Sequence, residues 1–246
     1  MKALAAIAAT LALATAAQAA VEERCSVPDI LVHPLALLPR VATSVKTQRK
    51  LDIVVLSGSP SQVGLANGPR SYPFFLDAAL RAKLQGVSVR VVIKTAPRRT
   101  AFEVVPTLPQ ILAEEKPTLV VWQSGTVEAY RGIDADAFGR KLRLGVTTLL
   151  DGGADVMLVN MQFSPRTDAL VDAASYTEMM RYVSELKDVP FFNRYAIMRT
   201  WSDGGAFDLA ALHIGREEYE QIHRCLGELM AQFIMRAASL SENASR

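Results

Sequence analysis

Apolar segments rich in β-branched residues alternate with helical patterns along most of this chain, one pair roughly every 30 to 40 residues. The apolar segments contain few polar residues, as expected for strands of a parallel sheet that helices cover on both faces. The pattern predicts one α/β domain with three layers, in which helices flank a doubly wound sheet of five mainly parallel strands. We expect strands at residues 51–57, 87–94, 118–123, 154–161 and 190–198, and helices at residues 72–84, 108–115, 135–150, 167–186 and 216–238.

The beginning of the chain matches a secretory signal peptide. Lys2 precedes an apolar run that ends at Thr15, and Ala17-Gln18-Ala19 has the small-x-small pattern of a cleavage site. The run is too short to span a bilayer comfortably, and no later segment approaches about 18 uninterrupted apolar residues. We therefore expect a signal peptide at residues 1–19, cleavage after Ala19, and export to the periplasm or the medium without a membrane anchor.

The rest of the chain divides into an arm and a domain. Residues 20–50 contain several prolines and no clear periodicity, which predicts an extended N-terminal arm, whereas residues 51–246 form a single domain without an internal repeat. The chain has two cysteines, Cys25 in the arm and Cys225 near the end. In an oxidising compartment we expect a disulfide between them that pins the arm to the last helix, and two unpaired structural thiols are the alternative.

The composition argues against several classes of partner. The chain has 27 basic and 25 acidic side chains, a net charge of +2 that falls to +1 when Lys2 leaves with the signal peptide. This balance provides no electrostatic footprint for nucleic acid. The three histidines are scattered and form no metal-ligand cluster, and neither a Gly-x-Gly-x-x-Gly turn nor a P-loop occurs. We therefore expect no nucleic-acid partner, no metal ion and no cofactor.

The first predicted strand ends abruptly at a small polar turn, Ser57-Gly58-Ser59-Pro60, which continues into Ser61. The turn puts Ser59 at the carboxyl edge of the sheet, where doubly wound proteins bind their ligands. Ser59 is then either a nucleophile on a strand-to-helix turn or the N-cap of the next helix, because Ser followed by Pro also starts helices. Residues 95–100, 124–131 and 201–213 are expected at the same crevice.

Three of these segments resemble blocks of the SGNH, or GDSL-type, hydrolase superfamily in the same order along the chain. Ser57-Gly58-Ser59 matches its strand-Gly-Asp-Ser block, Gly125-Thr126-Val127-Glu128 its Gly-x-Asn-Asp block, and Ala210-Ala211-Leu212-His213 its Asp-x-x-His block. The resemblance covers residues 50–238, nearly the whole domain. It implies a flavodoxin-like, SGNH-hydrolase type of fold and a serine esterase or O-acyl hydrolase, with Ser59 as the nucleophile and His213 as the base.

The chain departs from the superfamily at polar positions that support catalysis. Val127 stands where the superfamily has an oxyanion-binding asparagine, and residues 95–99 contain no glycine for its second block. Ala210 replaces the aspartate of Asp-x-x-His, so Asp208, five residues before His213, is the nearest candidate for the third member of a triad. The candidates for oxyanion or substrate contacts are Gly58, Thr95, Ala96, Arg98, Gln123, Gly125 and Trp201.

Several other residues have a structural interpretation. His223, inside the last helix, and His33, in the arm, are expected to be packing or surface residues. Trp122 is expected in the core, and Trp201 either in the core or in the wall of a substrate pocket. Glu128 is expected to cap a helix or to form an ion pair rather than to act in catalysis.

Functions of two different classes follow from these residues. The first is a serine hydrolase that acts on acyl or acetyl groups of a small molecule, a glycan or a lipid. The alternative is a catalytically weak or inactive binding protein of the cell envelope, for which the missing asparagine, glycine and aspartate argue. Acyl transfer to a sugar hydroxyl is a third and related reaction. All three functions are inferred by analogy with the fold. One fold can host many functions, so the site residues have to decide among them.

Overall fold

A computed structural model describes residues 23–57, 68–95 and 97–240 of the chain. Its five strands form one sheet in the order β2-β1-β3-β4-β5, and every neighbouring pair is parallel. The predicted doubly wound α/β fold is therefore confirmed. The strands are β1 (Lys50–Ser57), β2 (Ser88–Thr95), β3 (Leu119–Gln123), β4 (Asp155–Val159) and β5 (Phe191–Phe192).

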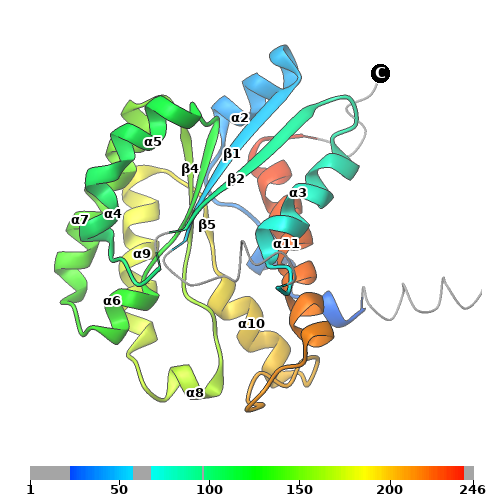
Figure 1. Cartoon of the computed structure of the whole chain (residues 1–246), viewed down its shortest axis with the longest axis vertical. Helices are drawn as coiled ribbons and strands as arrows, with labels where there is room; N and C mark the ends of the chain where they lie inside the picture. The colour runs from blue at the N-terminus through cyan, green and yellow to red at the C-terminus, as the bar shows by residue number, and fades with distance from the viewer. Residues whose placement is uncertain (1–22, 58–67, 96, 241–246) are drawn as a thin grey trace, which may run out of the picture.

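Helices cover the sheet on both faces (Figure 1). One face carries α3 (Tyr72–Lys83) and α11 (Arg216–Ala237), and the other carries α5 (Leu108–Glu115), α7 (Ala135–Asp151) and α9 (Ala173–Lys187). The side chains of β1 alternate between the two resulting cores: Ile53 packs on the α3 and α11 side, whereas Val54 faces the other helices. Gly227 lets α11 approach α3 closely, because a Cβ at Gly227 would lie 2.6 Å from the Cβ of Phe75.

Two predicted elements differ from the observed ones. The predicted strand at residues 190–198 is wrong beyond β5, because α10 (Arg194–Asp203) begins there; Asn193 caps it by accepting a hydrogen bond from the Ala196 N–H at 3.1 Å. The predicted helix at residues 167–186 is interrupted after α8 (Pro165–Asp168), because Asp172 caps α9 in the same way. The remaining short helices between the strands are α4 (Ala101–Val104), η3 (Val105–Thr107) and α6 (Thr126–Tyr130).

The arm that precedes β1 is not continuously extended as expected. Its described part includes the short helical segments η1 (Asp29–Val32), α2 (Pro39–Thr43) and η2 (Ser44–Gln48). The start of α2 is held by Asp155 at the beginning of β4, because one carboxylate oxygen of Asp155 accepts from the N–H groups of Arg40 and Val41 at 2.9 Å and 3.0 Å. The first N–H groups of a helix have no acceptor within that helix, and here a carboxylate of the sheet accepts from them.

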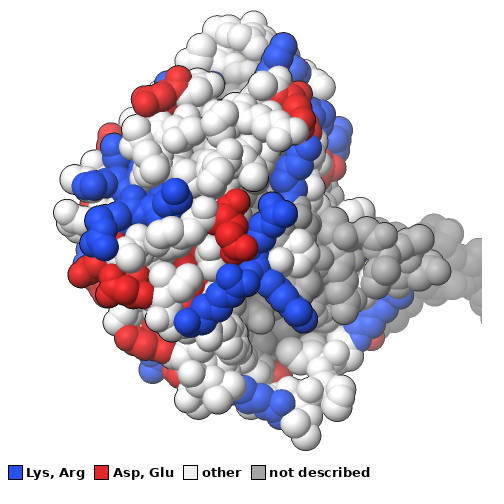
Figure 2. All heavy atoms as spheres, turned by 60° about the vertical axis from the view of Figure 1, so that its left-hand side comes forward, with Lys and Arg blue, Asp and Glu red and all other residues white. Residues whose placement is uncertain are grey.

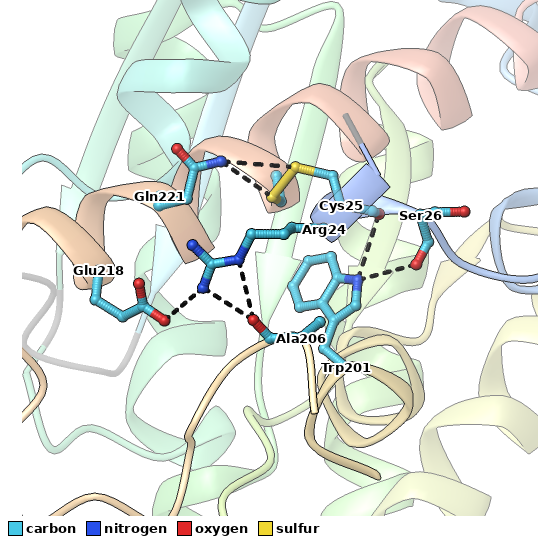
Figure 3. The surroundings of a disulfide bond; sticks show 8 residues. Arg24, Cys25, Ser26, Trp201, Ala206, Glu218 and Gln221 are labelled. Atoms are coloured by element: carbon cyan, nitrogen blue, oxygen red, sulfur yellow. Dashed lines mark hydrogen bonds and ion pairs between the residues drawn. A yellow bond between two sulfur atoms is a disulfide. The ribbon is translucent and has the colours of Figure 1, made fainter. Parts of the chain in front are cut away.

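The predicted disulfide is present between Cys25 and Cys225, and it joins the arm to α11. Figure 3 shows the side chains around this joint. Arg24 donates a hydrogen bond to the Ala206 carbonyl oxygen at 2.9 Å, and the indole N–H of Trp201 lies 3.3 Å from the Cys25 carbonyl oxygen. The arm is therefore tied both to α11 and to the end of α10 with the loop that follows it.

None of the described helices is long and apolar enough to cross a bilayer. Basic and acidic side chains are interspersed on the face that Figure 2 shows. This mixture agrees with the small net charge of +2 of the whole sequence.

Candidate functional site

The candidate site lies at the edge of the sheet where β1, β2 and β3 end. Ser57 is the register partner of both Thr95 and Gln123, so the last residues of these three strands lie side by side. Parallel strands share their carboxyl edge, and the segments that follow them meet there. The expected common edge is thus observed for the described parts of these segments.

A cavity of about 170 Å³ opens at this edge, between the ends of β1 and β3 and the helices α4 and α6. Leu56 and Trp122 contribute apolar wall, and Ser57, Ser124 and Val127 line the cavity where the strands end. Pockets for drug-sized ligands usually measure about 300–1,000 Å³. The cavity therefore suits a small chemical group rather than a whole large ligand.

Glu128 closes one wall of this cavity and is only 1% exposed. Its two carboxylate oxygens accept hydrogen bonds from the Ala101 N–H at 2.6 Å and from the Gly125 N–H at 3.1 Å, so that it caps both α4 and α6. Burial raises the pKa of Glu128, although these hydrogen bonds act in the opposite direction. The expectation of a capping role agrees with this geometry.

The sequence predicts an oxyanion or substrate contact at Gly125. Its φ of +97° is a backbone conformation that glycine adopts without strain, which explains the residue type at this turn. Its N–H, however, already donates to Glu128. In the observed geometry this N–H is therefore not available to a ligand.

The remaining oxyanion candidates have different positions. Gly58 and Ala96 lie outside the described residues, as does the predicted nucleophile Ser59. Thr95 ends β2 beside Ser57. Arg98 is exposed and does not line the cavity.

His213 and Asp208 both lie in the loop between α10 and α11, and both are exposed. Oδ1 of Asp208 accepts a hydrogen bond from the Ala210 N–H at 3.1 Å. Within the described parts of the chain, no hydrogen bond or ion pair joins Asp208 to His213. The loop would have to rearrange for Asp208 to orient the imidazole of His213.

The start of α11 lies beside the segment that leads into α3. Arg70 forms an ion pair with Glu220 at 2.6 Å, and the guanidinium of Arg216 donates to the Gly68 carbonyl oxygen at 3.4 Å. Arg216 follows His213 by three residues. The fold therefore places Gly68 and Arg70 beside the first turns of α11.

His223 is a packing residue, as expected. It is buried in α11, where its Nδ1 accepts a hydrogen bond from the Tyr72 N–H at 3.1 Å and its ring lies 4.2 Å from the ring of Tyr219. Burial lowers the pKa of His223 to about 3, so the imidazole is neutral at pH 7. His33 is exposed in the arm, 3.9 Å from Asp29.

Both tryptophans lie in the core. Trp122 in β3 is 1% exposed, and its ring packs so closely on α7 that a Cβ at Gly145 would lie 2.4 Å from it. Trp201 in α10 is equally buried, against Phe207, and does not line the cavity. Of the two expected positions of Trp201, the core and a pocket wall, the structure therefore shows the core.

Arg194 is a residue that the sequence analysis did not single out. It is 3% exposed at the start of α10, and its Nη1 donates to Oε1 of Gln123 at 3.2 Å. The hydroxyl of Tyr72 lies at the same distance from the same oxygen. The signal in the sequence is Asn193-Arg194 directly after the two residues of β5, and the prediction of a longer strand concealed it.

The part of the chain that the structure describes contains no cluster of His, Cys, Asp and Glu that could hold a metal ion. What the edge of the sheet offers is a small cavity, polar groups that end β1 and β3, and a buried guanidinium next to them.

Several solved structures have the same fold. A catalytic mutant of Axe2, an acetylxylan esterase from Geobacillus stearothermophilus, matches with a TM-score of 0.60 and 15% identity over 79% of this chain and 97% of that chain. TesA matches with a TM-score of 0.51 and 21% identity over 72% of this chain and 99% of that chain. LAE5, an alpha/beta hydrolase enzyme from the metagenome of Lake Arreo, Spain, matches with a TM-score of 0.57 and 17% identity over 77% of this chain and 94% of that chain.

The structures of Axe2 include catalytic mutants at a serine, an aspartate and a histidine, and that aspartate stands three residues before the histidine.

The sequence comparisons identify the family. No curated protein sequence matches the chain significantly. A family model described as the Non-GDSL lipase-like family matches residues 24–240. Together with the shared fold, this match confirms the resemblance to a divergent SGNH hydrolase. The chain is a member of the Non-GDSL lipase-like family.

Proposed function

We propose that the protein is an exported serine hydrolase that cleaves carboxylic ester bonds. The observation that carries the proposal is the small cavity at the carboxyl edge of β1 and β3, whose lining includes Ser57, two residues before Ser59 in the sequence. Membership in a lipase-like family and the esterase named among the structural relatives support the same reaction class. Because the identities to those structures are low, the activity is inferred from the site rather than transferred from them.

In the proposed reaction Ser59 is the nucleophile and His213 the general base. His213 removes the proton from the Ser59 hydroxyl while the serine oxygen attacks the ester carbonyl, and the carbonyl π electrons move to oxygen. The tetrahedral intermediate collapses by breaking the bond to the alcohol, which takes the proton from His213. Water, deprotonated by His213, then attacks the acyl-enzyme; the bond to the Ser59 oxygen breaks, His213 returns the proton to that oxygen, and the acid is released.

Ester groups of small size suit the cavity best. Its volume of about 170 Å³ accommodates an acetyl or another short acyl group, while the alcohol part of a small molecule, a glycan or a lipid stays outside. The signal-peptide pattern and the Cys25–Cys225 disulfide support a site of action beyond the cytoplasm. Acyl groups of the cell envelope or of extracellular material are therefore the proposed substrates.

Asp208 is the proposed third member of the site. If it orients His213, Asp208→Asn should lower kcat at least about tenfold, because the amide neither fixes the tautomer nor stabilises the charged imidazole. The measurement is turnover of 4-nitrophenyl acetate, with Asp203→Asn as a control because Asp203 is another exposed aspartate close to the same loop. Turnover that Asp208→Asn leaves unchanged would reduce the site to a Ser59 and His213 dyad.

The direct test is covalent labelling of the mature protein by a fluorophosphonate, followed by intact-mass analysis. We expect one adduct, which Ser59→Ala abolishes and His213→Ala strongly slows. Two matched controls should keep the adduct. Ser61→Ala changes another serine of the same predicted turn, and His33→Ala changes a histidine of the arm. Loss of the adduct in Ser61→Ala instead would transfer the nucleophile to Ser61.

A second candidate function is binding without efficient turnover, by a fold that has lost part of its catalytic site. Val127 and Ala210, where the superfamily has an asparagine and an aspartate, favour it. Absence of any adduct on folded protein would make this candidate the better one. Acyl transfer would appear as an adduct together with faster turnover when a sugar alcohol is added.

A further inference from the structure

The most unusual group near the site is the guanidinium of Arg194. It is 3% exposed, its Nη1 makes a hydrogen bond to a neutral amide, and its Nε is buried without a partner among the described residues. Buried arginines normally pair with a carboxylate, because an uncompensated buried charge is costly. No ion pair of Arg194 occurs in the described parts of the chain.

The groups around Arg194 do not neutralise it. Tyr72 and Tyr219 are the titratable groups that act on it most, and burial raises the pKa of both phenols, that of Tyr72 to about 12. His223 lies beside both tyrosines and is uncharged at pH 7. Burial lowers the pKa of Arg194 to about 10, which still leaves it charged at pH 7. A positive charge therefore persists in a nearly dry environment at the edge of the sheet.

This charge fixes the orientation of Gln123. Both Arg194 Nη1 and the Tyr72 hydroxyl lie 3.2 Å from the same atom of the Gln123 amide. A guanidinium can only donate hydrogen bonds, so that atom must be the amide oxygen. The two N–H groups of Gln123 consequently point away from Arg194, and they make no hydrogen bond to a residue within the described ranges.

Gln123 also belongs to the lining of the cavity. It ends β3, is the register partner of Ser57, and lines the cavity, whereas Arg194 and Tyr72 do not. The Gly125 N–H, another donor at this edge, is already bound to Glu128. The Gln123 amide, with its oxygen fixed and its N–H groups bound to no residue within the described ranges, is thus a donor at the end of β3.

We infer that Gln123 donates a hydrogen bond to the ester carbonyl oxygen as that oxygen becomes negative, and that Arg194 and Tyr72 are positioning residues that hold its amide for this purpose. The inference rests on the proposed esterase function. It assigns to Gln123 the contact that an asparagine at position 127 would make in the superfamily, where this chain has Val127. The charge on Arg194 polarises the Gln123 amide and strengthens its N–H as a donor. A donor fixed before the reaction stabilises the developing oxyanion without reorganisation.

The decisive variant is Gln123→Glu. The carboxylate keeps an oxygen for Arg194 and Tyr72 and gives Arg194 a counter-charge, but it has no N–H to donate. We expect kcat for 4-nitrophenyl acetate to fall about 10²- to 10³-fold with little change in KM, as for the loss of one oxyanion donor. Gln123→Met is a second variant without a donor or a new charge, and it keeps the test valid if Gln123→Glu does not fold.

Variants of Arg194 test the positioning role separately. Arg194→Met should lower kcat about 10-fold or more while KM changes little, and Arg194→Lys should restore part of the loss because it returns the charge and one donor. If Arg194 only supported the fold, both variants would lower the melting temperature, and kcat of the folded protein would not differ between Arg194→Lys and Arg194→Met. Gln48→Glu makes the same chemical change in the exposed end of η2 and should leave kcat unaffected.

The same experiment separates this inference from the proposed function. If wild-type protein forms a Ser59 adduct and turns over the ester, and folded Gln123→Glu and Gln123→Met do so at the wild-type rate, the inference is wrong while the esterase stands. If wild-type protein forms no adduct, both are wrong. A large fall in kcat at constant KM, with labelling by the fluorophosphonate slowed in parallel, supports both.

Discussion

Glu128 and Arg194 are both ionisable and almost fully buried at the same edge of the sheet, yet their surroundings differ. The carboxylate of Glu128 accepts hydrogen bonds from the first backbone N–H groups of two helices, one on each oxygen. The guanidinium of Arg194 has a neutral amide as its partner and a buried Nε with none in the described structure. Glu128 therefore completes the fold, whereas the Nε and the charge of Arg194 are not matched by any group in the described part of the chain.

The difference separates two uses of a buried polar group. A group whose capacity is filled by backbone N–H groups contributes to stability, because removing it leaves those N–H groups unsatisfied. A group whose charge is not compensated contributes little to stability and often opposes it. Such a group is useful when a negative charge appears during a reaction, which is the role inferred for Arg194 through Gln123.

Glu128→Ala should produce the largest change in stability. We expect the free energy of unfolding in urea to fall by about 2–4 kcal/mol, since two helix caps are lost at about 1–2 kcal/mol each. Glu217→Ala, at an exposed glutamate in the first turn of α11, is the control. A Glu128 variant that is fully stable but inactive would instead assign Glu128 to the reaction rather than to the stability of the fold.

His223 sharpens the comparison by its pH dependence. The pKa of His223 is about 3 in the fold against an ordinary value of 6.5, so between these values the unfolded chain binds the proton and the folded protein does not. The stability that neutral His223 provides is complete above pH 6.5 and is lost as the pH falls toward 3. We expect a loss of about 2–3 kcal/mol between about pH 7 and pH 4.5.

The variant His223→Asn isolates this contribution. The asparagine oxygen can accept the hydrogen bond from the Tyr72 N–H but does not titrate. Urea unfolding at several pH values should therefore show a flatter dependence in the variant. Glu128 acts with the opposite sign, because a carboxyl with a raised pKa favours the folded state as the pH falls through that value. Identical curves for wild type and His223→Asn would exclude His223 as the source of the pH-dependent stability.

Arg194→Met should have the smallest effect on stability. Replacing an uncompensated buried charge by an apolar side chain of similar length is often neutral or stabilising, so we expect a change within about 1 kcal/mol in urea unfolding. The same variant is expected to lose most of its activity. A loss of stability as large as that of Glu128→Ala would assign Arg194 to the fold instead.

Much of the fold follows from short stretches of sequence. The nearly continuous apolar run at residues 51–57 predicts a buried parallel strand, and β1 covers Lys50–Ser57. The pattern at residues 108–115 predicts α5 with the observed bounds. Cys25 and Cys225 pair as expected because they are the two cysteines of the chain. These features depend on local periodicity or on a simple count.

The candidate site follows from the sequence only in part. The turn after β1 and the histidine before the last helix mark Ser59 and His213, because blocks of residues at those places resemble a superfamily. The cap that ends β5 early and starts α10 was not predicted, although Asn193 is a typical N-cap. Local propensity did not reveal that the strand would stop after two residues.

The sequence by itself therefore determined the alternation of strands and helices, the disulfide and the family, since these depend on residue type and spacing. Only the tertiary structure decided that Arg194 meets Gln123 across 71 residues of sequence, and that the Gly125 N–H is bound by Glu128. The physical reason is that the partner of a buried polar group is set by how helices pack on the sheet. Spacing along the chain does not contain that information.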